Sequence, residues 1–182
     1  SGDYNAAFGH NALTLSTDAS RNTAIGVDAM AATTTGTHNT AVGQAALYLN
    51  TTASANVAIG QESLRTNTTG GMNTAVGLQS LYANTTGASN TAVGSRALDA
   101  NTTASYNVAV GDSAVTENTT GASLTAVGYA ALYANTTGAD NTAIGQYSLN
   151  KNTEGLRNTA TGVCVLACKD LITSYKHLVR PL

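Results

Sequence analysis

The sequence predicts an all-β protein, a parallel β-solenoid built from ten seventeen-residue turns. The first observation is a repeat: a glycine that follows "AV", "AI" or a close variant recurs at 9, 26, 43, 60, 77, 94, 111, 128, 145 and 162. The second is composition, because the Thr, Val, Asn and Gly that fill each unit are poor helix formers. A fixed period is typical of solenoids, and seventeen residues are too few for a two-helix repeat.

Each unit is numbered here from its leading asparagine, so that the recurring glycine falls at place 5. Place 3 is alanine in every unit, and place 4 is Val or Ile except for Phe8 and Thr161. Place 9 is Leu except for Met30 and Val115, whereas place 10 varies and is expected to face outward. Because neighbours on a strand point to opposite faces, places 3 and 4 must line different surfaces.

We expect places 4 and 9 to fill the core and place 3 to lie outside. The predicted core ladder is Val42, Ile59, Val76, Val93, Val110, Val127 and Ile144 with Leu47, Leu64, Leu81, Leu98, Leu132 and Leu149. Two large aliphatic side chains per turn form a thin core for seventeen ordered residues, which favours lateral association through a smooth face. The interface candidates are Ala41, Ala58, Ala75, Ala92, Ala109 and Ala126. The alternative is that these alanines fill a tight interior beside the leucines.

Within one turn, "TAVG" and the "AL" segment each predict a short strand, joined by a turn and by the loop "ANTTG". The glycine at place 5 suits positive φ or a close approach of two backbones. The asparagine at place 1 suits a ladder of stacked amides at a corner. The solenoid is expected to cover residues 1–166. In residues 167–182 apolar side chains recur with helical spacing, which predicts a capping helix or, alternatively, a segment that docks on a partner.

Composition and motifs argue against several functional classes. A net charge of −2 with 10% charged residues gives no basic face for nucleic acid, and no apolar run reaches the roughly 20 residues of a membrane helix. The histidines His10, His38 and His177 are too far apart in the repeat for nucleophilic catalysis. Cys164 and Cys168 lack the further ligands of a metal site, so they are expected to be free thiols or to form an interchain disulfide. We therefore expect no enzyme activity, metal or cofactor.

Threonine forms the most regular polar column. Place 13 is Thr in all nine complete units, from Thr17 to Thr153, and place 14 is usually Thr as well. Tight turns need such side chains to bond the local backbone, and this is the favoured interpretation. A column of hydroxyls could also bind ice, but adjacent threonines on an extended chain would face opposite ways.

The stretches "NTAVGQAALYLNTTAS", "NTAVGLQSLYANTTGAS" and "NTAIGQYSLNKNTEG" resemble repeats of phage and bacterial tail-fibre proteins. They are more distantly similar to the "SVAIGxxA" repeats of YadA-like heads in trimeric autotransporter adhesins. The resemblance covers residues 5 to about 166 and implies a left-handed β-roll with three chains packed side by side. Adhesin heads use shorter units, so the cross-section here is expected to differ.

Two functional hypotheses follow, with ice binding as a weaker third. The first is a structural rod of a phage tail fibre or a bacterial surface appendage, with copies of the chain as partners in a homotrimer or in end-to-end filaments. The second is an adhesin head that binds cell-surface glycan or matrix through place 10, where the candidates are Tyr48, Tyr82 and Tyr133. Either would place the chain on a virion or outside a bacterial cell.

Overall fold

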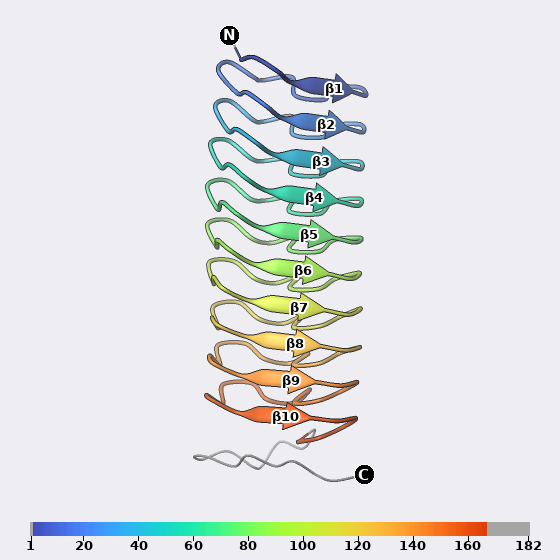
Figure 1. Ribbon diagram of the computed structural model, residues 1–182, viewed down its shortest axis with the longest axis vertical. Coiled ribbons are helices and arrows are strands. Elements are labelled where there is room, and N and C mark those ends of the chain that lie inside the picture. Colours follow the sequence, from blue (N-terminus) through green and yellow to red (C-terminus); the bar gives the residue numbers. More distant parts are fainter. Residues whose placement is uncertain (1, 167–182) are drawn as a thin grey trace.

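The computed structural model describes residues 2–166, and over this range the chain forms a parallel β-solenoid (Figure 1). Each seventeen-residue unit makes one turn, and the turns stack along one axis in sequence order. The predicted capping helix over residues 167–182 lies outside the described residues, as does Cys168. No helix occurs within residues 2–166.

One three-residue strand from each turn joins a single sheet whose strand order follows the chain. The strands are β1 (Ala6–Phe8), β2 (Thr23–Ile25), β3 (Thr40–Val42), β4 (Val57–Ile59), β5 (Thr74–Val76), β6 (Thr91–Val93), β7 (Val108–Val110), β8 (Thr125–Val127), β9 (Thr142–Ile144) and β10 (Thr159–Thr161). All neighbouring pairs are parallel, and each residue pairs with the residue seventeen positions later, as Ala75 does with Ala92. This register confirms that identical places of the repeat lie above one another.

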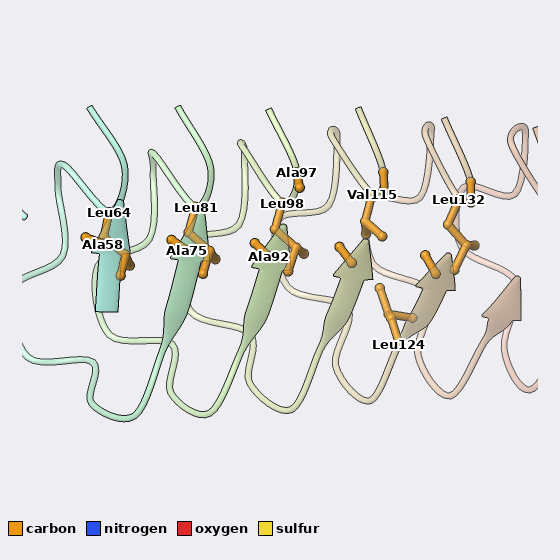
Figure 2. Packing of buried hydrophobic residues seen from close by; sticks show 14 of the residues in the cluster. Ala58, Leu64, Ala75, Leu81, Ala92, Ala97, Leu98, Val115, Leu124 and Leu132 are labelled. Atoms are coloured by element: carbon orange, nitrogen blue, oxygen red, sulfur yellow. The ribbon is translucent and has the colours of Figure 1, made fainter. Parts of the chain in front are cut away.

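The core contains the side chains of places 3 and 9, so the prediction that place 4 faces inward and place 3 faces outward is wrong. The leucine ladder is buried as predicted: Leu47, Leu64, Leu81, Leu98 and Leu132 have no exposed surface, and Leu149 is 3% exposed. The alanines proposed as a subunit interface, Ala41, Ala58, Ala75, Ala92, Ala109 and Ala126, are completely buried within the single chain. They match the alternative interpretation, a tight interior beside the leucines (Figure 2).

The aliphatic column at place 4 lies on the outer side of the sheet. Val42, Val76 and Val110 are half-buried, and Ile59, Val93, Val127 and Ile144 are exposed, Ile59 by 40%. Side chains alternate along the strand, so places 2 and 4 share the outer face while place 3 points inward. The facing wall carries a leucine in almost every turn, and a small alanine fits opposite it where Val or Ile would overpack the core.

The second predicted strand is absent from each described turn. Places 7 and 9 have left-handed backbones instead, with φ of 54° at Gln79 and 52° at Leu81, and these torsions do not form an extended strand. The segment still bonds the neighbouring turns: the N–H of Gln79 donates to the Gln61 carbonyl, and the N–H of Leu81 donates to the Ala97 carbonyl. The prediction that place 9 faces inward is therefore correct, but the strand inferred there is not, and place 8 is buried as well, as Ser80 and Leu81 show.

Two columns of buried asparagine amides run along the rod and close most of its turns. At place 1 the Asn73 Oδ1 accepts from the backbone N–H of Asn90 at 2.9 Å, and Nδ2 donates to the Gly87 carbonyl at 2.9 Å. This confirms the predicted amide ladder. A second ladder at place 12 was not predicted: Asn84 Nδ2 donates to Asn67 Oδ1 at 2.8 Å and to the same Gly87 carbonyl at 3.0 Å. The two ladders thus hold the loop from both sides.

Candidate functional site

The outer side of the sheet, formed by places 2 and 4, is called the strand face here. Place 2 contributes Thr23, Thr40, Val57, Thr74, Thr91, Val108, Thr125, Thr142 and Thr159, and β1 has Ala6 at this place. Place 4 contributes Phe8, Ile25, Val42, Ile59, Val76, Val93, Val110, Val127, Ile144 and Thr161. No charged residue occurs at either place, and the register stacks place 2 on place 2 and place 4 on place 4 along the sheet, whose strands follow one another in Figure 1.

The threonine hydroxyls of the strand face make no hydrogen bond with any other group in the described part of the chain. They are half-buried and stand beside the methyl groups of place 4. A hydroxyl that has a donor and two acceptor positions remains available to an outside partner. The strand face therefore combines an apolar column with a parallel column of unused hydrogen-bonding groups.

The place 13 threonines differ, because their hydroxyls are used within the fold. Thr68 Oγ1 donates to the Thr85 carbonyl of the next turn at 3.0 Å, and the same bond recurs from Thr17 through Thr136. This column of hydrogen bonds joins neighbouring turns, in agreement with the interpretation that the repeated threonines bond the backbone. An ice-binding surface at place 13 would need these hydroxyls to be free.

Two of the three tyrosines proposed as sugar contacts belong to one cluster with Arg65. The Arg65 guanidinium lies between the rings of Tyr48 and Tyr82, with its carbon 5.4 Å and 5.7 Å from their centroids. Its Nη1 donates to the Tyr82 hydroxyl at 3.3 Å, and its Nε lies 3.7 Å from Glu62 Oε1. Tyr133 lies further along the rod, outside this cluster. Because sugars stack on open aromatic faces, the arginine occupies one of the two faces of each ring that the adhesin hypothesis would use at Tyr48 and Tyr82.

The titratable groups with altered pKa values lie apart along the rod. Burial raises the pKa of the Asp99 carboxyl, and the positive charge of Arg96 only partly opposes the shift. The pKa of Tyr147 is raised chiefly by its hydrogen bond with Tyr129, whose ring packs edge to face at a centroid distance of 5.2 Å. Burial thus accounts for the first pKa shift, and the contact with Tyr129 accounts for most of the second.

The residues considered for metal binding or catalysis do not come together in the described chain. No group of three or more His, Cys, Asp or Glu side chains suitable for a metal ion occurs within residues 2–166. His38 contacts Arg21 and Thr37 on the surface, and Cys164 is an exposed free thiol. Residues 2–166 also contain no helix long and apolar enough to cross a bilayer.

Comparisons of the chain with protein-family models, with curated proteins and with solved structures find no match in any of the three collections. The tail-fibre resemblance therefore remains a prediction from the repeat, and functional inference depends on the strand face and on the shape of the molecule.

Proposed function

We propose that this chain is a stiff, non-catalytic rod that separates two parts of a larger assembly, such as a phage tail fibre or a bacterial surface appendage outside the cell. The observation that carries the proposal is the hydrogen bonding that joins every turn to the next. Backbone hydrogen bonds join every pair of neighbouring strands, and the amide ladders and the place 13 hydroxyls add further bonds at other corners of the turn.

Such bonding gives a rod whose resistance to bending comes from every side of its cross-section. Strand spacing of about 4.8 Å gives ten turns a length of about 43 Å between the first and last strands. Solenoids of this kind behave as one-dimensional arrays in which each repeat contacts only its neighbours. A spacer needs a constant rise rather than a pocket, and the register, which is the same from β1 to β10, supplies it.

The proposal is tested by distances between spin labels placed along the rod. Thr35, Thr103 and Thr137 share the exposed place 14 in different turns, and each can be replaced by Cys after Cys164→Ser and Cys168→Ser. We expect the label pair at 35 and 137 to give a narrow distribution near 29 Å for six turns, and the pair at 35 and 103 one near 19 Å for four turns. Broad distributions, or distances that do not scale with the number of turns, would rule out a stiff rod.

A further inference from the structure

We propose that the strand face binds ice. This surface is distinct from the threonines of places 13 and 14, and the proposal does not rest on the spacer function. Places 2 and 4 are separated by one residue on an extended strand, so their side chains point the same way. The adjacent threonines of places 13 and 14 do not meet that condition. The place 4 side chains are accessible to solvent, by 36% at Val93 and 42% at Ile144.

The side chains of the strand face are stiff and similar in shape. From β2 to β10 every residue at places 2 and 4 is Thr, Val or Ile, and such β-branched side chains have few accessible χ1 rotamers. The propensity for β-sheet also favours aromatic residues, yet neither place has one in these nine strands. Another outward column, place 6, varies from His10 through Leu78 to Asp112 and Tyr129. The uniform shape is therefore a particular property of the strand face.

The sheet that carries the strand face does not accumulate twist. Neighbouring strands of an ordinary sheet are rotated by about 20°, which over nine steps would turn β10 about half a revolution from β1. Figure 1 instead shows the ten strands keeping one direction along the rod, and their register is the same at both ends. Ladders of side chains can hold a sheet flat, and the two asparagine ladders join the same turns. Places 2 and 4 thus form a flat array that is regular in two directions.

The spacings of this array are close to those of ice. Levels repeat about every 4.8 Å along the rod, and places 2 and 4 are about 6.6 Å apart along a strand. Oxygen atoms on the prism faces of hexagonal ice lie on a rectangular net, whose short side is close to the spacing of strands and whose long side is close to two extended residues. Water molecules held over one level of the strand face therefore lie near lattice positions, and the next level repeats them.

The two columns supply complementary contacts for such water molecules. The unbonded hydroxyls of place 2, such as those of Thr74 and Thr91, can donate to and accept from water. The methyl groups of place 4 cannot, so the water molecules over them bond to one another and lose orientational freedom. Val57 and Val108 interrupt the hydroxyls of place 2 but keep the methyl groups. No charged side chain with its own hydration shell lies in either column.

A protein partner fits the strand face less well than ice does. Nine spacings along the axis and about 6.6 Å between places 2 and 4 enclose roughly 300 Å². Each partner in a specific protein interface contributes at least about 500 Å². Widening the surface to place 6 would add polar side chains such as His10, Gln44 and Asp112. An ice lattice is assembled from single water molecules, so it can follow a narrow array without a complementary protein surface.

Thermal hysteresis, the gap between the melting and freezing points of a seed ice crystal, tests the proposal on the full chain under reducing conditions. Thr74→Tyr with Thr91→Tyr places two rings on the strand face, and Thr86→Tyr with Thr103→Tyr places the same rings on the exposed place 14 of the same turns. Tyrosine is favoured in strands and keeps a hydroxyl, so the first variant chiefly removes the flatness of the array. We expect thermal hysteresis in wild type and in the place 14 control, and its loss in the strand-face variant.

A milder pair keeps the test usable if circular dichroism shows that the tyrosines prevent folding. Thr74→Ser with Thr91→Ser removes two methyl groups and keeps both hydroxyls, and we expect less thermal hysteresis than in the control Thr86→Ser with Thr103→Ser. A wild type without thermal hysteresis overturns the proposal, whether it is monomeric or self-associated in sedimentation equilibrium. A folded strand-face variant as active as its place 14 control overturns it as well. Either result leaves the spin-label test of the rod unaffected, because that test measures only distances between turns.

Discussion

Gly77 occupies place 5, where the backbone has a φ of +134° and passes close to the next turn. A Cβ added there would lie 2.5 Å from the Gly94 carbonyl oxygen. Both reasons predicted for this glycine, positive φ and close approach, therefore apply at once. The same backbone conflict recurs from Gly9 to Gly145, and the positive φ recurs at Gly162 as well, which explains why no side chain replaces glycine at place 5.

We expect Gly77→Ala to lower the free energy of unfolding by about 1 to 3 kcal/mol from backbone strain alone, with the steric clash adding to this. Gly71→Ala is the matched control, because a Cβ there meets only the Ser54 carbonyl oxygen at 3.0 Å and Ala88 occupies the same place 16. The control should change stability by no more than about 0.5 kcal/mol. Urea denaturation measures both, and equal effects would show that the conformation at place 5 is not what requires glycine.

The face that a residue column occupies could be predicted from the sequence only where the chemistry of the side chain allows a single face. Period and alternation established that Ala75 and Val76 face opposite ways, but both are apolar, so nothing in their chemistry says which is inside. That choice depends on the separation between the sheet and the opposite wall, which is a property of the folded cross-section. Asn84 was missed for a related reason: in a loop sequence, a buried amide looks the same as an exposed one.

At the scale of the element, the joint between β8 and β9 differs from the other joints between turns. Leu124 stands at place 1 in the eighth unit, where the other units carry asparagine. It points into the core and is fully buried (Figure 2). Its own N–H is bonded by Asn107 Oδ1 at 2.9 Å, but Leu124 offers no oxygen to the next turn. The N–H of Asn141 consequently has no acceptor among the described residues, which is costly for a buried group.

We expect the amide of Asn141 to exchange its hydrogen faster than that of Asn90, whose N–H is bonded by Asn73 at 2.9 Å. Leu124→Asn should slow exchange at Asn141 roughly fivefold, since a net hydrogen bond contributes about 1 kcal/mol. Leu124→Val, which supplies no acceptor, is the control and should give no such slowing. Native-state exchange followed by NMR provides the rates. The proposed weak joint would be disproved by an Asn141 amide as protected as that of Asn90 in the wild-type chain.

On the scale of the whole molecule, the rod has no single core that all of its turns contact. Contacts between strands join each turn only to the turn before and the turn after it. In such an array, opening begins at an end and proceeds inward. A substitution therefore lowers the hydrogen-exchange protection only of those turns that open together with the substituted turn. This behaviour could be anticipated from the seventeen-residue period alone, because it depends on connectivity rather than on which side chains face inward.

Two leucine substitutions at the same place of the repeat test this property. Leu81 lies in the fifth turn and Leu149 in the ninth, and both are buried, so replacement by Ala should remove about 2 to 5 kcal/mol in either case. We expect Leu149→Ala to lower hydrogen-exchange protection only in the last turns, because the middle can still open from the other end at its former cost. Leu81→Ala should instead lower the protection maximum in the middle and leave both ends unchanged. Exchange measured by mass spectrometry on the two variants resolves these profiles, and a uniform loss of protection along the chain in Leu149→Ala would mean that the rod unfolds as a single unit.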